Sequence, residues 1–351
     1  MSLTEQIKKI LPPDEAAMQE ARDRWNGIAK PIGSLGLLED AVTQIAGLTG
    51  SAKVQLGKRA VLVMCADNGV VAEGVTQTGQ EVTALVAGNM VKHDSSVCRM
   101  AQVVHAEVYP IDMGMIAPAE GVRDEHILRG TGNIALGPAM TREEAARAVE
   151  KGIDLVGELK TQGYSIIATG EMGIGNTTTA SAMLAAFLEM EPALVTGRGA
   201  GLSDEGLRRK VNAIERALKV NCPDPADGLD VLGKVGGLDI AGMCGTFLGG
   251  AIHRVPILVD GFISAVAALC ALRIAPGSRQ AMLAAHVSAE PAARMVLEAL
   301  DLKPLISAGL RLGEGTGAVA ALPLLDMALA VYDGMVTFDN IGMEAYEVNL
   351  K

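Results

Sequence analysis

The chain has 351 residues, 49% of them hydrophobic and 20% charged, which is enough to bury one large core or two smaller ones. Its formal net charge of −11 argues against a nucleic-acid-binding protein, whose surface carries a basic patch. The charge does not exclude an anionic small molecule, because backbone N–H groups bind phosphate without a net positive charge. Aromatic residues make up only 3% and glycine contributes 41 residues, which favours layered α/β packing over a β-sandwich.

Cysteine and histidine spacing indicates neither disulfides nor zinc. The five cysteines lie far apart without a C-x-x-C pair, which is typical of reduced thiols buried in a cytosolic protein. The five histidines have no i, i+4 spacing. The opening residues MSLTEQIKKILPPDE lack the apolar segment of a signal peptide, and the apolar stretches 240–252 and 261–272 are shorter than a membrane span. We therefore expect a soluble, cytoplasmic protein with no membrane span.

Along the chain, a helical opening is followed by alternating strands and helices. Residues 1–50 have a polar helical pattern with a turn at 30–36, and from residue 59 onward short apolar runs alternate with helical patterns. This alternation predicts βαβ units, hence a three-layer, mostly parallel, Rossmann-like sheet with helices on both faces. We expect a large α/β domain at 51–333 and a small helical domain from 1–50 and the tail 334–351. The predicted strands are 60–66, 106–112, 164–170, 255–260 and 281–286, with a weaker one at 193–197.

Several helix starts are predicted from capping residues. Thr78 with Glu81 and Thr141 with Glu144 both fit a capping box, in which two side chains satisfy free N–H groups of the first turn. Pro291 suits the first position of a helix. Ser203 suits the N-cap of the helix that follows it.

Polar residues follow the ends of the predicted strands. Ligands of open α/β sheets bind outside the carboxyl ends of the strands, so these residues are expected at one edge. Each of them also suits a turn or a helix cap, but together they predict an active site. The set comprises Asp67, Asn68, Gly69, Asp112, Gly170, Glu171, Asp260, Gly261, His286 and Ser288, to which the separate segment before the last apolar run adds Gly313 and Glu314.

The stretch GEMGIGNTTTASA, from residue 170, predicts a binding turn between a strand and a helix. The helix begins at Asn176 or Thr177, so backbone amides and the positive end of the helix dipole face a ligand. The stretch lacks the lysine of a P-loop and the third glycine of a dinucleotide fingerprint. Glu171 would repel a pyrophosphate, so we expect a neutral or cationic ring beside it.

A second glycine cluster stands at 196–210. Gly197, Gly199 and Gly201 can form a nest of N–H groups for a phosphate monoester, with Arg198 or Lys210 neutralising its charge. A flexible surface loop fits the same residues equally well.

Asp260 has no neighbouring acid, which argues against a magnesium-pyrophosphate donor. No G-x-S-x-G elbow is present, so acyl-transfer hydrolysis is unsupported. We expect neither a metal nor a cofactor.

Taken in order, five segments resemble the nicotinate-nucleotide:5,6-dimethylbenzimidazole phosphoribosyltransferase family of cobalamin lower-ligand assembly. These are CADNGVVAEGVTQTGQEVTA, GEMGIGNTTTASA, GRGAGL, AAHVSAEPA and LRLGEGTGA, which together extend over nearly the whole chain. The resemblance implies a parallel-sheet α/β domain, a small helical domain built from both termini, and a homodimer. It also implies transfer of phosphoribosyl from nicotinate mononucleotide to dimethylbenzimidazole, which yields α-ribazole 5′-phosphate and nicotinate.

The resemblance also implies roles for individual residues. Glu314 corresponds to the general base of the family, and Glu171 is expected beside the nicotinate with Gly173, Gly175 and Asn176. The phosphate is expected at Gly199, Ser288 and Lys210. The benzimidazole is expected near Gln77, Gln80 and Leu312, with Asp260 and Gly313 as further substrate contacts.

The chemistry of Glu314 follows independently from its surroundings in the sequence. A benzimidazole must lose its ring N–H proton as it attacks the ribose C1′, and a carboxylate within hydrogen-bond reach can accept that proton. The flanking glycines allow a flat base to approach the backbone, and we expect burial against Leu312 and the helix after Gly317 to strengthen the base. The pyridinium leaves as neutral pyridine, so no general acid is required. The position is expected to be a loop with no packing role.

The residues alone leave two alternative functions open. A base- or nucleotide-binding protein would use the same edge without turnover. A nucleoside-phosphorylase-like transferase would need a site for free phosphate. The sequence does not indicate which base is the preferred acceptor.

Overall fold

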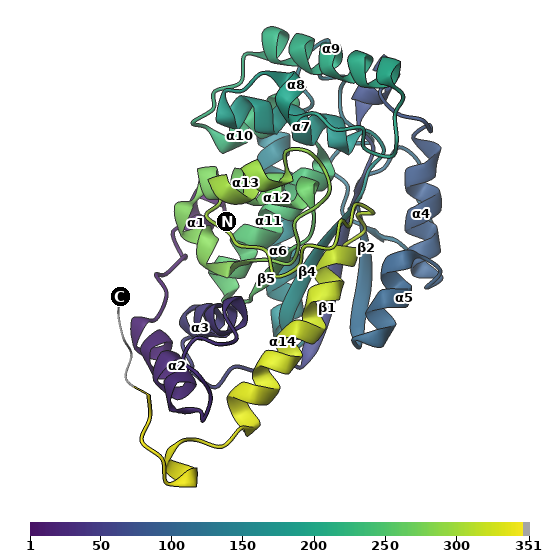
Figure 1. The fold of residues 1–351 in the computed structure, drawn as a ribbon. Helices are drawn as coiled ribbons and strands as arrows, with labels where there is room; N and C mark the ends of the chain where they lie inside the picture. Colours follow the sequence, from purple (N-terminus) through teal and green to yellow (C-terminus); the bar gives the residue numbers. More distant parts are fainter. Residues whose placement is uncertain (347–351) are drawn as a thin grey trace.

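A parallel β-sheet forms the centre of the molecule (Figure 1). The computed structural model describes residues 1–346, and its six described strands lie in the order β3-β2-β1-β4-β5-β6 with every neighbouring pair parallel. The strands are β1 (Lys58–Ala66), β2 (Ala106–Gly114), β3 (Arg123–Asp124), β4 (Tyr164–Met172), β5 (Ile257–Val259) and β6 (Met282–Ala284).

Helices occupy most of the remaining chain. The α-helices are α1 (Leu3–Ile7), α2 (Glu15–Gly27), α3 (Leu37–Thr49), α4 (Glu81–Val91), α5 (Ser96–Val103), α6 (Arg142–Thr161), α7 (Asn176–Leu188), α8 (Pro192–Val195), α9 (Asp204–Asn221), α10 (Gly228–Val235), α11 (Leu238–His253), α12 (Phe262–Ile274), α13 (Ala293–Ala299) and α14 (Thr316–Gly334). Three 3-10 helices are η1 (Gly69–Glu73), η2 (Pro276–Ala281) and η3 (Asp339–Ile341).

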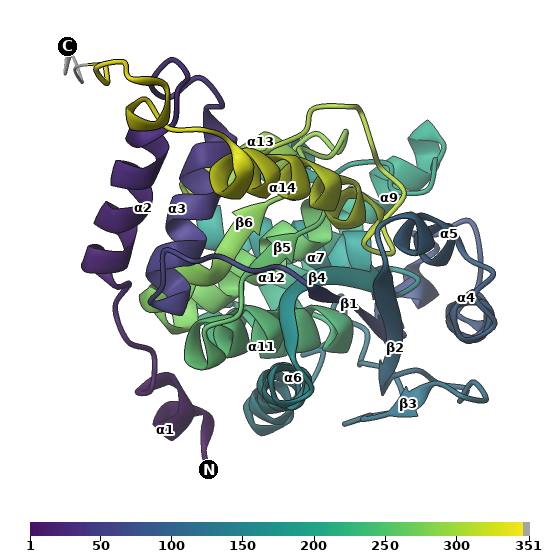
Figure 2. The ribbon, with the colours of Figure 1, turned by 90° about the horizontal axis from the view of Figure 1, so that it is seen from below.

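The two faces of the sheet are covered by different helices. Alternate residues of a strand point to opposite faces, and in β1 Leu62 and Met64 pack with α6, α11 and α12. Val61, Val63 and Cys65 pack instead with α3, α4, α5 and α14. Figure 2 shows α6 and α11 on one side of the strands and α14 on the other. This arrangement confirms the predicted three-layer α/β fold and explains why the central strands are apolar on both faces.

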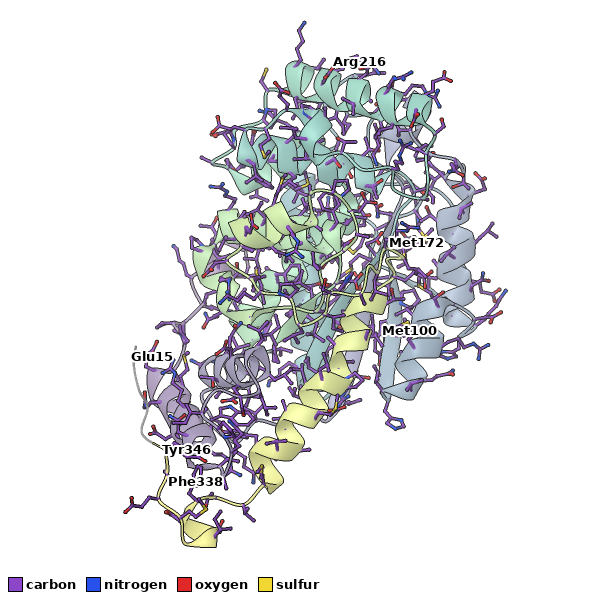
Figure 3. The ribbon with its side chains drawn as sticks, in the orientation of Figure 1. Glu15, Met100, Met172, Arg216, Phe338 and Tyr346 are labelled. Atoms are coloured by element: carbon purple, nitrogen blue, oxygen red, sulfur yellow. The ribbon has the colours of Figure 1, made fainter. Side chains whose placement is uncertain are left out.

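Residues from both ends of the chain pack together. The rings of Trp25 and Tyr332 lie 4.7 Å apart between centroids, and Arg24 Nε donates to the Tyr332 carbonyl at 2.8 Å. Beyond α14, the Phe338 N–H donates to the Gly27 carbonyl at 3.0 Å. Figure 3 shows Phe338 and Tyr346 in the same corner of the molecule as Glu15. The predicted division into domains at 50 and 333 stays a prediction, and residues 347–351 of the predicted tail lie outside the described residues.

Helix α14 is the helix that the sequence predicts after Gly317. It has 19 residues with a mean hydropathy of 1.3, and among the described helices it alone is long and apolar enough to cross a membrane by those two criteria. Ala318, Leu322 and Leu325 on one of its faces are fully or almost fully buried against the sheet core. A core helix passes the same test, so the finding by itself is weak evidence.

Most strand predictions are confirmed, and one is wrong. The five stronger predictions match β1, β2, β4, β5 and β6, although β5 and β6 are only three residues long. The weaker strand at 193–197 is wrong, because Pro192 opens the short helix α8 there. The two-residue strand β3 was not predicted, because two residues show no alternation.

The capping predictions divide evenly. Thr141 accepts from the Glu144 N–H at the start of α6, and Ser203 accepts from the Gly206 N–H at the start of α9, so both are confirmed. The box of Thr78 and Glu81 is wrong, because α4 starts after Gln80, whose side chain is bonded to the Asn68 carbonyl at 3.0 Å. Pro291 precedes α13 by two residues and is not its first residue.

The prediction of buried thiols holds for four cysteines and fails for one. Cys65, Cys98, Cys244 and Cys270 are buried, whereas Cys222 is exposed. Cys222 lies at the C-cap of α9 with a φ of 43°, where the chain turns away from the core.

Candidate active site

A cavity of about 260 Å³ opens at the carboxyl ends of the strands. Segments that follow β4, β5 and β6 reach it, together with the loop at 199–200 and the segment before α14. Figure 3 shows Met172, at the end of β4, near the N-terminal end of α14. The residues around the cavity include Glu171, Met172, Gly173, Asn176, Thr177, Gly199, Asp260, His286, Ser288, Glu290, Leu312, Gly313 and Glu314.

One wall of the cavity combines a glutamate with the start of a helix. Gly175, with a φ of 95°, turns the chain after β4, and α7 begins at Asn176 as predicted. The Asn176 Nδ2 group donates to Glu171 Oε2 and also to Asp239 Oδ2, the latter at 2.8 Å. Asp239 is fully buried in the first turn of α11 and does not reach the cavity surface. One amide therefore links a carboxyl group in the cavity to one behind it.

Glu171 is an acid in the cavity whose protonation is strongly perturbed. Burial raises its pKa to about 8, and the negative charges of Asp239, Asp260 and Glu314 act in the same direction. The hydrogen bond from Asn176 opposes the rise because it favours the ionised form. Burial also raises the pKa of Asp239 to about 6. At neutral pH the pair therefore holds less negative charge than two free carboxylates would.

The opposite side of the cavity contains Asp260 and His286. Asp260 Oδ1 accepts from the Ala318 N–H at 2.8 Å and lies 3.7 Å from His286 Nε2. Burial raises the pKa of Asp260, while the neighbouring histidine lowers it. Both side chains are 4% exposed, and the His286 Nδ1 atom has no hydrogen-bond partner in the part of the chain that the structure describes. That atom is a buried polar group left without a partner beside the cavity.

A buried lysine lies behind the start of α7. The Lys210 Nζ group donates to Thr177 Oγ1 at 2.8 Å and to the Gly197 carbonyl at 3.1 Å, and the side chain is fully buried. Burial lowers its pKa to about 8, against the raising effect of Glu290. Thr177 and Gly199 lie between this ammonium group and the cavity, and a Cβ atom on Gly199 would stand 3.6 Å from Nζ. The lysine thus supplies positive charge beside the N-terminus of α7, as an anion site requires.

Glu314 has a structural contact that the sequence did not predict. Its backbone has a φ of 61°, and its Oε2 atom accepts from the Val97 N–H at 3.1 Å in the first turn of α5. The prediction that Glu314 has no packing role is therefore wrong. The predicted burial against Leu312 is also wrong, because Leu312 lies at the cavity with 57% of its surface exposed.

Nine of the thirteen predicted site residues line the cavity, and the other four do not. Gly175 caps α7, and Lys210 lies behind Thr177. Gln77 is exposed and bonded to the carbonyls of 200 and 201, and Gln80 is bonded to the Asn68 carbonyl. The predicted benzimidazole contacts of Gln77 and Gln80 thus find no support in the cavity, because both amides are engaged elsewhere.

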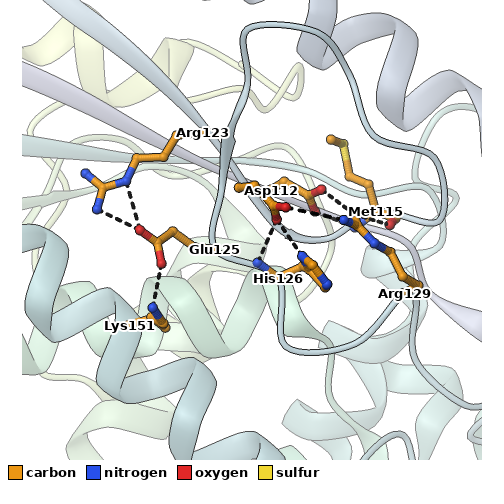
Figure 4. Close-up of polar contacts among 8 residues, drawn as sticks. Asp112, Met115, Arg123, Glu125, His126, Arg129 and Lys151 are labelled. Atoms are coloured by element: carbon orange, nitrogen blue, oxygen red, sulfur yellow. Dashed lines mark hydrogen bonds and ion pairs between the residues drawn. The ribbon is translucent and has the colours of Figure 1, made fainter.

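Two acids of the predicted edge belong to a separate polar network. Asp112 accepts from Arg129 Nη1 and from the Met115 N–H, both at 2.7 Å. Figure 4 shows this group beside the ion pairs that Glu125 makes with Arg123 and Lys151. Asp67 accepts from the Ile116 N–H at 2.8 Å. Neither Asp67 nor Asp112 lines the cavity, because β1 and β2 lie toward the other edge of the sheet.

Three functional candidates were absent from the predicted site residues. Thr177 and His286 line the cavity, although the sequence placed them only within the helix start and the polar edge. Asp239 was missed altogether. An acid two residues after Gly237, at the start of an apolar helix, was the only signal, and helix N-termini commonly carry acids.

An open α/β sheet with two glutamates, a helix N-terminus and a buried lysine around one cavity is an arrangement suited to binding an anionic ligand beside carboxyl groups. A family model described as phosphoribosyltransferase, DBI_PRT, matches residues 10–343. The chain therefore belongs to this phosphoribosyltransferase family.

Individual relatives agree with the family model. The nicotinate-nucleotide–dimethylbenzimidazole phosphoribosyltransferase of Ruminiclostridium cellulolyticum is 43% identical over 349 residues, covering 99% of each chain. The enzyme of the same name from Geobacter metallireducens is 44% identical and covers 97% of this chain and 98% of its own. The crystal structure of CobT from Thermus thermophilus superposes with a TM-score of 0.89 at 40% identity, covering 94% of this chain and 100% of that one.

Proposed function

We propose that the protein transfers the phosphoribosyl group of nicotinate mononucleotide to 5,6-dimethylbenzimidazole, giving α-ribazole 5′-phosphate and nicotinate for cobalamin biosynthesis. The names of the full-length relatives support this reaction. The observation that carries it in this chain is the cavity itself, which brings the β4–α7 segment, with Glu171 and the start of α7, together with the distant Glu314.

The donor occupies the wall formed by β4 and α7. Its phosphate lies by Gly199 and Ser288, where the N-terminus of α7 and the Lys210 ammonium group provide positive potential. The cationic nicotinate ring lies beside Glu171. Ionised Glu171 stabilises the ring's charge in the bound donor, and Gly173 and Asn176 complete the wall. Asp260 and His286 face the part of the substrate between ring and phosphate.

Glu314 acts as the general base. As the acceptor nitrogen attacks C1′, the ring N–H proton passes to the Glu314 carboxylate, while the C1′–N bond electrons return to nicotinate as a neutral pyridine. The Val97 N–H fixes one oxygen of this carboxylate, which leaves the other oxygen for the acceptor. Leu312 and Gly313 border the space for the flat acceptor ring.

Attack from the side away from nicotinate inverts C1′ and converts a β-nucleotide into an α-riboside. A covalent glycosyl ester on a glutamate would give retention through two inversions. Single displacement fits better, because one glutamate serves as the base and the other stands beside the leaving ring. We further propose that the enzyme is a cytoplasmic homodimer.

The decisive experiment incubates the purified protein with nicotinate mononucleotide and a panel of benzimidazole, purine and phenolic bases. Mass spectrometry then identifies the products. We expect α-ribazole 5′-phosphate and nicotinate to form in equal amounts. Nicotinate release that needs free phosphate would indicate a phosphorylase instead, and binding without release would indicate a binding protein.

A further inference from the structure

Asp239 is a buried acid that the reaction scheme above does not use. It is fully buried in the first turn of α11, where helix N-termini favour an ionised carboxylate. Its Oδ2 atom accepts from Asn176 Nδ2 at 2.8 Å, and its Oδ1 atom has no partner within residues 1–346. No basic side chain is bonded to it among these residues. A carboxyl group in this setting is costly to keep for packing alone.

The contact with Asn176 connects Asp239 to the donor wall. The two hydrogens of one amide nitrogen are shared between Glu171 Oε2 and Asp239 Oδ2, so the two carboxyl groups stand on either side of that nitrogen. A Cβ atom on Gly173 would lie 2.5 Å from Asp239 Oδ2 and 3.1 Å from Asn176 Nδ2, so the backbone packs directly on this bridge. A Cβ atom on Gly313 would lie 2.5 Å from Glu171 Oε1. The positions of both acids are therefore closely fixed.

We propose that Asp239 is a positioning residue of the donor site: its carboxyl group holds the Asn176 amide against Glu171. Asp239 also makes the two acids retain one proton, which is released when the cationic donor ring binds. This inference rests on the proposed function, because it requires a pyridinium ring beside Glu171. Two like charges at such separation disfavour double ionisation, and an arriving positive charge removes that penalty. The proton passes from Glu171 to solvent, and the ring's positive charge takes its place.

The charges around the pair are consistent with proton retention. Burial is the largest cause of the raised pKa of Glu171, followed among the raising causes by Asp239, Asp260 and Glu314. For Asp239 the raising causes are burial and Asp67. The titratable groups that face the pair from the packed elements are Cys65 on β1, Asp67 after β1, Asp260 after β5, His286 after β6 and Glu314 before α14. Within residues 1–346 no basic side chain is bonded to Glu171 or Asp239, so no bonded cation replaces the proton before the donor binds.

The direction of the pH effect follows from these charges. Glu171 must be ionised to stabilise the ring, so kcat/KM for the donor rises with pH to a plateau, with a midpoint near pH 8. Asp239→Asn preserves an oxygen acceptor for Asn176 but removes a negative charge. The Glu171 pKa then falls, and the midpoint moves down by about one pH unit. At pH 7 the variant is consequently about fivefold faster in kcat/KM than the wild type, a gain that structural damage does not produce.

The first test is calorimetry of nicotinate mononucleotide binding at pH 7 in buffers of different ionisation enthalpy, without acceptor. The slope gives the number of protons released, which we expect to be about 0.9 for the wild type given the raised pKa of Glu171. The number measured for Glu171→Gln gives the protons that come from the phosphate and Lys210, and it is subtracted from the wild-type number. Asp239→Asn should release fewer protons than the wild type. Asp112→Asn, a buried acid outside the cavity, is the matched control and should leave the number unchanged.

The second test is the pH profile of kcat/KM. A midpoint that Asp239→Asn leaves within about 0.2 pH units of the wild type would overturn the proposal, while Asp239→Ala, which also removes the acceptor for Asn176, should lower kcat/KM at every pH. If neither Asp239 variant folds, the number of protons that the wild type releases on donor binding decides the question. The inference is refuted if the wild type releases no more protons than Glu171→Gln. Absence of turnover in the wild type would instead contradict the proposed function.

Discussion

Replacing Glu314 by Gln removes the proposed catalytic base but keeps the side chain's hydrogen bond with the Val97 N–H. The glutamine Oε1 atom still accepts from the Val97 N–H, so the first turn of α5 keeps its partner. The change turns a charge-assisted hydrogen bond into a neutral one, which costs about 1 kcal/mol of folding free energy. For a chain of this size the melting temperature should fall by only about 1–2 °C.

The effect on turnover should be much larger. Without a carboxylate the acceptor N–H proton has no base, and we expect kcat to fall by about 10²–10⁴-fold, equivalent to about 3–5 kcal/mol of transition-state stabilisation. Product formation is followed by mass spectrometry at saturating donor and acceptor. The donor dissociation constant should stay within about twofold of the wild-type value, because Glu171 and Lys210 are intact.

The matched control is Glu298→Gln on the exposed surface of α13, which makes the same chemical change away from the cavity. It should leave kcat and the melting temperature unchanged. A kcat of Glu314→Gln within about threefold of the wild type would remove Glu314 from the role of base. A fall in melting temperature above about 10 °C would show that the contact with Val97, and not proton transfer, explains a loss of activity.

Four further outcomes are expected. Lys210→Met should raise the donor KM at least about tenfold, measured by initial rates, because the phosphate site loses the positive charge behind Thr177. Burial lowers the pKa of Lys210 in the folded state to about 8, below its usual value of 10.5. The buried charge therefore destabilises the folded state by the full amount below pH 8. This destabilisation is lost above pH 10.5, where the lysine is neutral in both the folded and the unfolded state. Denaturation at pH 7 should therefore show Lys210→Met more stable by up to about 3 kcal/mol, and equal stability would contradict this account. Gly313→Ala should lower kcat/KM for the donor about tenfold or more, because the new Cβ displaces Glu171 Oε1; unchanged kinetics would show that this oxygen moves freely. EDTA should not change the rate, and loss of activity that magnesium restores would show that the phosphate site is a metal site. NMR of the anomeric proton should show an α-riboside, and a β-configured product would refute single displacement.

The fold class and the composition of the donor wall could both be predicted from local sequence patterns. Continuous apolar strands alternating with capped helices are a local signal, so β1, β2 and β4 were predictable from short windows. The parallel sheet then places every segment after a strand at one edge, which is why Glu171 and Asp260 were correctly brought together, whereas Glu314 precedes α14 and was added by its motif. The start of α7 at Asn176 followed from its glycine-rich turn.

Only the tertiary structure decided which polar groups share an environment. Gln77 and Gln80 look available in the sequence, but their amides are bonded to backbone carbonyls of other segments. Asp239 looks like an ordinary first-turn acid, but packing places it behind Asn176 and away from water. Protonation depends on burial and on charges brought close by folding, and neither quantity is encoded in a local pattern. The raised pKa of Glu171 is therefore a property of the assembled sheet edge, where three acids from distant segments surround one carboxyl group.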